Sequence, residues 1–97
     1  MKSSRGHDII CVDLDGTLCN EICFTVKEAE NATLNKKNAK IVEEFYLKNY
    51  VIIYTARRDE LLEATLRWLR LNNVRYHAIS NLKIPASVYF DDKARKA

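Results

Sequence analysis

The chain has 97 residues, 30% of them charged, and a formal net charge of +3 at pH 7. This length predicts a single domain over residues 1–97, and the mild positive charge suits an anionic substrate without by itself indicating nucleic acid. The sequence has no long apolar run that predicts a transmembrane helix and no apolar N-terminal segment typical of a signal peptide. The 3 cysteines fit a reducing compartment better than a disulfide framework, so we expect a cytoplasmic protein without membrane contact.

The first predicted element is a short buried strand over residues 9–12, which runs into the sequence Asp-Leu-Asp-Gly-Thr. Side chains two residues apart on a strand point the same way, so Asp13 and Asp15 are expected to face one pocket. Gly16 allows the backbone to turn sharply away. Such a pair suits one carboxylate as nucleophile and the other as proton donor, with a hard cation between them. The plain alternative is a polar turn, since Asp and Gly are ordinary turn residues.

Residues 17–35 form the least regular stretch, and we expect a small hairpin or loop over the site there, too short for a cap domain. Within it, Cys19 and Cys23 have no partner His or Cys in a metal-ligand pattern, so zinc is not expected. Asn35 is suited to cap a helix that runs to about Asn49.

A second helix is predicted after the apolar run 50–54. Asp59 is suited to cap this helix, and Asn72 and Asn73 should end it. Its leucines are expected to face the sheet: Leu61, Leu62, Leu66 and Leu69. Residues 74–79 follow as the third predicted strand.

Further polar side chains stand at the ends of predicted strands or in a loop. Thr55 follows the run 50–54, Lys83 lies in a loop, and Asp91 and Asp92 follow the last apolar run. Ligands of open α/β sheets collect outside the carboxyl ends of the parallel strands, so we expect these side chains to meet the first carboxylate pair there. Taken singly, each also fits a plain role: a helix cap, a solvated loop charge and a turn.

The order of these motifs resembles the four-motif signature of the haloacid dehalogenase superfamily: Asp-x-Asp-Gly-Thr, a strand ending in Thr, a Lys, and a strand ending in Asp-Asp. The resemblance runs from Ile9 to Lys93. Most members are magnesium-dependent phosphohydrolases, and the acid at Asp15 resembles the phosphatase branch. The segments Ile-Tyr-Thr-Ala-Arg and Trp-Leu, and a Lys shortly before Asp-Asp-Lys-Ala, are similar to small capless phosphatases of bacterial capsule and surface-sugar biosynthesis. One departure is that Ile84 precedes Pro85, whereas in those relatives Pro often follows the Lys directly.

The resemblance implies an α/β fold: a three-layer, Rossmann-like parallel sheet of about four strands in the order 3-2-1-4, flanked by helices and without a cap domain. In that order, residues 80–87 must cross from the third strand to beyond the first. Fully extended, they reach roughly 28 Å, which suffices for a taut loop but not for a crossover helix. We therefore expect an extended connection that carries Lys83 past the site. The last strand should be a sheet edge, through which a homo-oligomer could form.

The resemblance also implies roles for individual residues. Asp13 is expected to be the nucleophile and a metal ligand, giving an aspartyl-phosphate intermediate. Asp15 is expected to protonate the leaving oxygen and then to activate water, with its main-chain carbonyl as a metal ligand. Thr55 should bind a phosphoryl oxygen, and Lys83 should offset the charge on the phosphoryl group and on the nucleophile.

The expected cofactor is Mg²⁺, which screens the repulsion between a carboxylate and an anionic phosphate. Asp92 is expected to coordinate the metal directly, and Asp91 to act from the outer shell or to pair with Lys83. Ala56 and Arg57 lie just past the second strand and are expected to bind the substrate, although exposed charges near helix ends are commonplace.

These features together predict a magnesium-dependent phosphohydrolase that acts on a small phosphate monoester, above all a sugar phosphate. Two alternatives stay open. An open, capless site also admits a nucleic-acid 3′-phosphate, although the aromatic residues fall mostly in strands or helix stripes, where they do not favour strand binding. The other alternative is a non-catalytic module that binds magnesium and phosphate, against which the filled catalytic positions argue.

Overall fold

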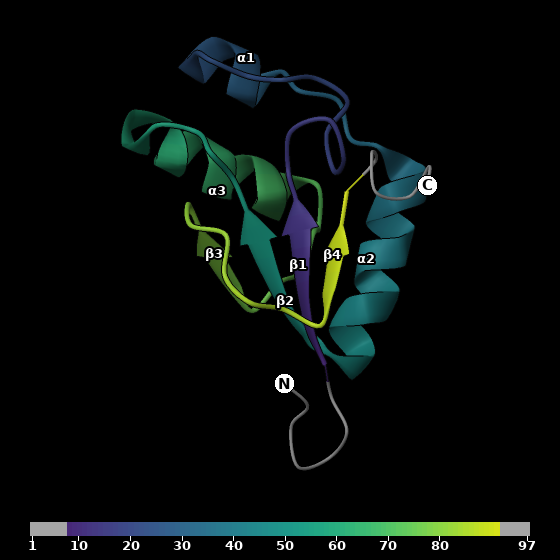
Figure 1. The fold of residues 1–97 in the computed structure, drawn as a ribbon. Coiled ribbons are helices and arrows are strands. Elements are labelled where there is room, and N and C mark those ends of the chain that lie inside the picture. The colour runs from purple at the N-terminus through teal and green to yellow at the C-terminus, as the bar shows by residue number, and fades with distance from the viewer. Residues whose placement is uncertain (1–7, 92–97) are drawn as a thin grey trace.

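Strand β1 (Ile9–Asp13) occupies an inner position of a four-stranded parallel sheet in the computed structural model of the protein, which describes residues 8–91 (Figure 1). The other strands are β2 (Tyr50–Tyr54), β3 (Ala78–Ser80) and β4 (Val88–Phe90). Their order is β3-β2-β1-β4, and helices flank the sheet. The α/β fold class and the strand order expected from the sequence are therefore confirmed.

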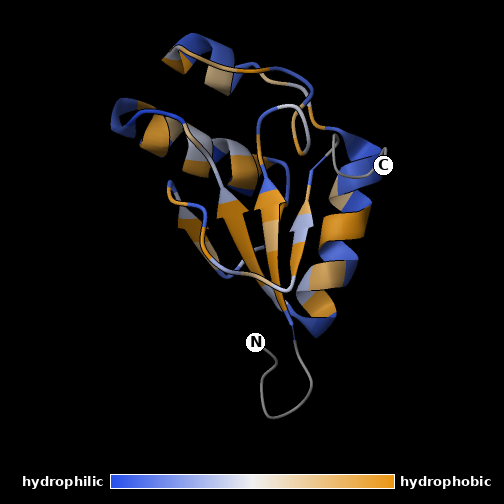
Figure 2. Cartoon of the chain, viewed as in Figure 1, coloured by the Kyte–Doolittle hydropathy of each residue, from blue (hydrophilic) through white to orange (hydrophobic). Residues whose placement is uncertain are grey.

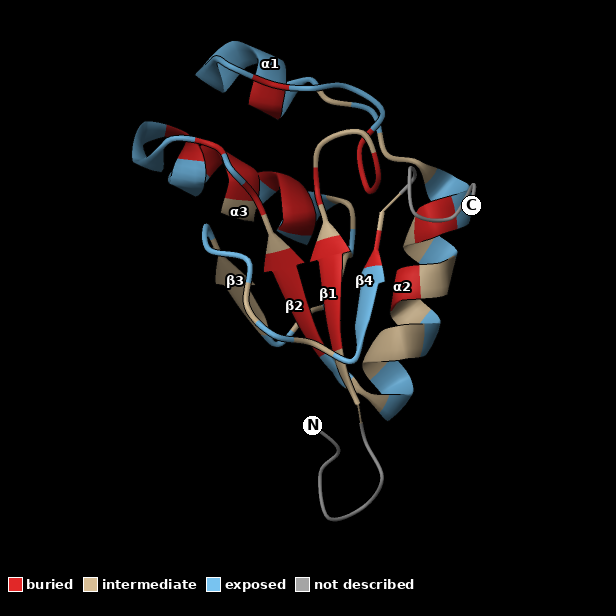
Figure 3. Cartoon of the chain, in the orientation of Figure 1, coloured by how far each residue is buried: buried red, intermediate tan, exposed pale blue. Residues whose placement is uncertain are grey.

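The pleat divides the sheet into two different faces. On one face, Val12 stands in register with Ile53 on β2 and with Phe90 on β4, and all three are buried. On the other face, Cys11 stands in register with Ile52 and Tyr89. Figure 3 shows the buried centre of β1 and β2 beside the more exposed β4. The face that carries Val12 therefore forms the main core.

Helices α2 (Lys36–Lys48) and α3 (Leu62–Leu71) supply the other side of that core. Val42 of α2 and Trp68 and Leu69 of α3 are buried in one cluster with the strand side chains. The indole N–H of Trp68 donates to the carbonyl oxygen of Ala32 at 2.8 Å, so the largest core side chain also satisfies its polar atom. Figure 2 shows the hydrophobic residues gathered along the strands and on parts of both helices.

The predicted cap of α2 is confirmed, and the predicted cap of α3 is wrong. The side chain of Asn35 accepts a hydrogen bond from the backbone N–H of Asn38 at 3.0 Å. Asp59 instead begins a 3₁₀ turn (Asp59–Leu61) that precedes α3, and neither start has a side-chain cap. Of the leucines expected to face the sheet, Leu69 is buried with the strand side chains, whereas Leu61 is buried in a second cluster with Ala29 and Leu62 is 44% exposed.

The end of α3 is where the sequence indicates, but the third strand begins later than predicted. Asn72 is the C-cap residue, and Asn73 adopts a left-handed conformation with φ of 59°. The backbone N–H of Val74 then donates to Leu69 at 2.9 Å, which ties residue 74 to the helix end rather than to the sheet. The first residue of β3 in register with β2 is therefore Ala78, opposite Ile52.

Residues 17–35 form the expected loop, which an antiparallel bridge between Cys19 and Leu34 closes. The loop also contains a short helix that was not predicted, α1 (Val26–Glu30). Thr25 and Glu28 form a reciprocal capping box at its start. The buried Ala29 of α1 packs in a cluster with Ala64 of α3. In Figure 1, α1 lies beyond the carboxyl ends of the strands and alongside α3.

The connection between β3 and β4 crosses the sheet without a helix, as predicted. Residues 81–87 have no regular secondary structure, and they carry the chain from one edge of the sheet to the other. β4 is a sheet edge, and association through this edge stays a prediction. Across residues 8–91, none of the helices combines the length and the hydropathy needed to cross a membrane.

Candidate active site

The carboxyl edge of the sheet gathers three of the predicted site residues. Asp13 is the last residue of β1, Thr55 directly follows β2, and Asp91 directly follows β4. Because the three strands are adjacent and parallel, their ends meet at one edge. The topology therefore brings together motifs that are far apart in the sequence.

Several charged groups act on the carboxyl group of Asp13. Burial raises the pKa of Asp13, and the negative charges of Asp91 and Asp15 raise it further. The positive charge of Lys83 and a backbone hydrogen bond at Leu14 lower the pKa of the same carboxyl. Asp13 thus lies between like charges on its own sheet edge and a cation from the crossing connection.

Lys83 lies over the face of the sheet that carries Asp13. Its ammonium group is 5.4 Å from the ring centroid of Tyr54 and 5.9 Å from that of Tyr89. Its charge acts on Cys11 as well as on Asp13, lowering the pKa of each. Tyr54 stands in register with Asp13, so the aromatic contacts hold the ammonium group beside the carboxyl edge.

A hard divalent cation prefers oxygen ligands, and this edge of the sheet carries carboxylate and carbonyl oxygens. Asp13 and Asp91 supply carboxylates. Burial is the largest cause of the raised pKa of Asp13 and the charge of Asp91 is the second, so a cation between the two carboxylates would relieve their repulsion. The main-chain carbonyl of Asp15 is the third donor that the sequence predicts. Asp92, the predicted direct ligand, lies outside the described residues.

The second carboxylate of the first motif has a different partner. Arg57 donates to Asp15 along one edge of its guanidinium group, from Nη2 to Oδ1 at 2.6 Å and from Nε to Oδ1 and Oδ2 at 3.1 and 3.2 Å. The side chain of Arg57 is 2% exposed and that of Asp15 is 18% exposed. Burial lowers the pKa of Arg57, but the hydrogen bonds and charge of Asp15 more than offset this and raise it. The two residues form a buried, bidentate ion pair.

Further contacts fix the guanidinium group itself. Arg57 Nη1 donates to the hydroxyl of Thr65 at 2.9 Å, and that hydroxyl donates to the carbonyl of Leu61 at 2.8 Å. The sequence suggests that Arg57 binds substrate, but its side chain turns inward, and its direct contact in this structure is with Asp15, the predicted proton donor. Ala56, the neighbouring predicted binding residue, is exposed.

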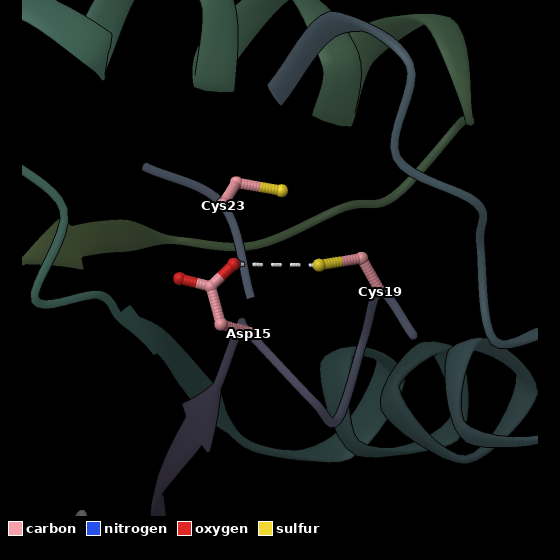
Figure 4. A group of neighbouring side chains, drawn as sticks. All are labelled: Asp15, Cys19 and Cys23. Carbon is pink, nitrogen blue, oxygen red and sulfur yellow. Dashed lines mark hydrogen bonds between the residues drawn. The ribbon is translucent and has the colours of Figure 1, made fainter. Parts of the chain in front are cut away.

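Two cysteines complete the surroundings of Asp15 (Figure 4). The thiol of Cys19 donates to Asp15 Oδ1 at 3.5 Å, and its sulfur lies 3.5 Å from Arg57 Nη2. The ligand atoms of Asp15, Cys19 and Cys23 lie within 4.8 Å of one another. Burial, followed by the charge of Asp15, raises the pKa of Cys19 to about 12, so this thiol stays protonated. With Arg57 already supplying the positive charge, the cluster acts as a hydrogen-bonded support for Asp15.

Thr55 is positioned by the backbone on both sides. Its N–H donates to the carbonyl of Ser80 at 3.0 Å, and its hydroxyl oxygen accepts from the N–H of Arg57 at 3.1 Å. A hydroxyl that accepts one bond can still donate its proton. Thr55 can therefore donate to a phosphoryl oxygen at the carboxyl edge, as the sequence predicts.

Sequence reasoning missed the supporting roles of Thr65 and Cys19. A signal for Thr65 exists: it falls four residues after Leu61 and four before Leu69, on the apolar side of α3. A polar residue at such a position needs a buried partner. Cys19 offers no comparable signal, because a buried thiol is ordinary core packing.

The fold and the edge residues define an α/β domain with a cluster of carboxylates and cations at the carboxyl ends of its parallel strands. No family model matches the chain, and no curated protein matches it. Its fold is similar to that of a chain in the Pnkp1/Rnl/Hen1 RNA repair complex, with a TM-score of 0.67 and 20% identity over 95% of this chain and 28% of the other. A chain in a second structure of the Pnkp1/Rnl/Hen1 complex has a TM-score of 0.63 and 24% identity, over 86% of this chain and 27% of that one.

A third similar structure is a conserved protein from Bacteroides thetaiotaomicron, with a TM-score of 0.69 and 19% identity. The alignment covers 90% of this chain and 77% of the Bacteroides protein. The chain thus spans a little over a quarter of the two repair-complex chains and most of the third. At these identities, the likeness establishes the shared fold.

Proposed function

We propose that the protein is a magnesium-dependent phosphohydrolase that cleaves phosphate monoesters through an aspartyl-phosphate on Asp13. The observation that carries this proposal is the division between the two carboxylates of the first motif. Asp13 faces the charges of Asp91 and Lys83, whereas Asp15 is held by Arg57. One carboxylate is thus arranged with charged groups that suit phosphate, and the other is oriented for proton transfer.

The carboxylates of Asp13 and Asp91 and the main-chain carbonyl of Asp15 would hold Mg²⁺, and Asp92 is a further proposed ligand. The bound ion supplies the positive charge that lets an anionic phosphate approach an anionic nucleophile. Lys83 adds a second positive charge from the crossing connection, and Thr55 donates a hydrogen bond to a phosphoryl oxygen.

In the first step, a carboxylate oxygen of Asp13 attacks phosphorus, and the bond from phosphorus to the leaving oxygen breaks. Asp15 is ionised in its pair with Arg57, so it must take up a proton before this step. It then gives that proton to the leaving oxygen, which departs as an alcohol. In the second step, Asp15 takes a proton from a water molecule, whose oxygen attacks phosphorus. The bond between phosphorus and Asp13 then breaks and inorganic phosphate is released.

The test is phosphate release from a panel of sugar phosphates, nucleotides and 3′-phosphorylated oligonucleotides, with and without Mg²⁺. Asp13→Asn is the matched blank, because it removes the nucleophile and keeps the shape of the side chain. We expect release that requires Mg²⁺ and that disappears in this variant. Turnover that persists in Asp13→Asn would refute the covalent mechanism.

A second candidate function is the removal of phosphate from nucleic-acid 3′ ends. The similarity of the fold to a chain of an RNA repair complex favours it, at the level of fold alone. Release confined to the oligonucleotides in the same panel would select this function. Magnesium binding without any turnover would instead favour a non-catalytic binding module.

A further inference from the structure

A hollow of about 310 Å³ opens on the Asp15 side of the candidate site. It is lined by residues from the loop before α1 and from the segment after β2, among them Asp15, Ile22, Phe24, Ala56, Arg58 and Leu61. We call it the Phe24 hollow. Its volume is at the lower end of the range of about 300–1,000 Å³ for small-molecule sites, so it suits one compact group rather than a polymer segment.

Two large apolar side chains in this lining lie outside the hydrophobic core. Phe24 is 75% exposed and Ile22 is 65% exposed. A hydrophobic residue directly before a helix cap commonly packs against the first turn of the helix, but the exposure of Phe24 shows that its ring does not. An aromatic ring that remains exposed beside a candidate active site is suited to contact a ligand.

The backbone beneath the Phe24 ring is nevertheless fixed. Glu28 accepts hydrogen bonds from the N–H of Phe24 at 2.8 Å and from the N–H of Thr25 at 3.1 Å. The Thr25 hydroxyl accepts in return from the N–H of Glu28 at 3.1 Å. The capping box thus presents the ring from a defined position, which lowers the entropic cost of a contact with a ligand.

A second hollow, of about 290 Å³, lies on the other side of Arg57 and Arg58. It is lined by Thr55, Leu62 and Asn81 and does not include Asp15. Under the proposed function, on which this inference rests, Asp15 gives its proton to the leaving oxygen. The leaving group therefore occupies the hollow that Asp15 lines, and the Phe24 hollow is the one that selects the substrate.

The lining of the Phe24 hollow favours a leaving group that carries an aromatic ring over a sugar alone. Ile22, Phe24, Ala56 and Leu61 offer apolar surface, and the guanidinium group of Arg57 is already bonded to Asp15. Hydroxyl groups of a sugar can bond there to Arg58 at the border, but a sugar alone gains little from the apolar surface. A flat aromatic group instead gains stacking on Phe24.

We propose that the Phe24 hollow binds the nucleoside part of a nucleoside phosphate, with the base stacked on Phe24. Arg58 borders the hollow and has an 80% exposed side chain, whose ion pair with Glu60 at 3.7 Å is weak in solvent. It can turn to a second phosphate, whether that belongs to a free nucleotide or to the next residue of a strand. This inference narrows the substrate class and departs from the sugar phosphate expected from the sequence.

The test compares two substrates that differ only in the base, adenosine 5′-monophosphate and ribose 5-phosphate. We expect the wild-type kcat/KM to be at least about 10-fold higher for the nucleotide, the lower part of what stacking on an aromatic side chain supplies. Phe24→Leu should abolish this preference, whereas Phe24→Tyr should keep it. The matched control is Leu62→Ala, which removes an apolar side chain from the second hollow and should leave the preference unchanged.

Equal kcat/KM for the two substrates, or a preference that survives Phe24→Leu, would overturn the nucleoside site while leaving the phosphohydrolase standing. Equilibrium binding of adenosine 5′-monophosphate to the Asp13→Asn variant tests the nucleoside site independently of hydrolysis. If no monoester is hydrolysed but this binding is weakened about 10-fold by Phe24→Leu, the nucleoside site stands and the proposed function fails. A 3′-phosphorylated oligonucleotide that outperforms adenosine 3′-monophosphate would support the site and identify a strand end as the source of the nucleoside.

Discussion

Asp15→Asn is the substitution that best tests the buried ion pair, because it keeps the shape of the side chain and removes its charge. Arg57 would then keep its hydrogen bond to Thr65, but its guanidinium group, with the side chain 2% exposed, would lose its counter-ion. Removing one partner of a buried pair typically costs about 3–5 kcal/mol. The asparagine carbonyl can still accept one hydrogen bond, so we expect a loss of about 3 kcal/mol in the free energy of unfolding.

Urea denaturation followed by the fluorescence of Trp68, the single tryptophan and a buried one, measures this loss. For a domain of this size, the expected loss corresponds to a fall in Tm of roughly 12–24 °C. Arg57→Met is the complementary variant, and the double variant should lose less stability than the sum of the two single ones, since the partners interact. A loss below about 1 kcal/mol for Asp15→Asn is typical of an exposed ion pair, and it would refute the prediction that Arg57 needs Asp15 as a buried counter-ion.

Three other variants give expected results with separate readouts. Asp13→Asn should raise the free energy of unfolding at pH 7 without Mg²⁺, because burial and Asp91 raise the pKa of Asp13 above its ordinary 3.8. The wild-type protein has the full stability of protonated Asp13 below pH 3.8 and loses it as the pH rises through the raised pKa of this group. The stability gained by Asp13→Asn should therefore vanish in acid. A variant that is less stable than the wild type at pH 7 would contradict this. Lys83→Met should lower kcat/KM about 100-fold. It should also move the acid limb of the pH profile of kcat/KM to higher pH, because Lys83 lowers the pKa of Asp13. An acid limb that does not move would show that the two charges do not interact. Thr25→Ala should cost about 1 kcal/mol through the lost cap and speed amide hydrogen exchange in α1, and unchanged exchange there would mean that the capping box does not hold the helix.

The sheet could be predicted from the sequence because its signals are local. The apolar runs that form β1, β2 and β4 each end in the polar residue that the motif supplies, and parallel topology then brings those ends together. The crossing connection followed from the strand order that the family resemblance implied, and its lack of a helix followed from chain length, since residues 80–87 are too few for one. These inferences needed no knowledge of side-chain packing.

The surroundings of Asp15 could not be predicted in the same way. The inward turn of Arg57 depends on Thr65 from α3 and on Cys19 from the loop after β1, and no local pattern joins these positions. α1 is a different case, because the Thr-x-x-Glu pattern that begins at Thr25 is a known helix-start signal that the sequence interpretation did not use.

The edge position of β4 has a consequence for how the candidate site opens and closes. β4 pairs with β1 through only three positions, and two of its residues, Val88 and Tyr89, are at least 40% exposed. Lys83 and Asp91 lie on either side of this short strand in the chain. A local fluctuation that frees β4 from β1 would withdraw both charges while β1, β2 and β3 stay paired, so the site can come apart at a lower free energy than the domain unfolds. Amide exchange in β4 that is faster than in β2 would be the signature of this partial opening.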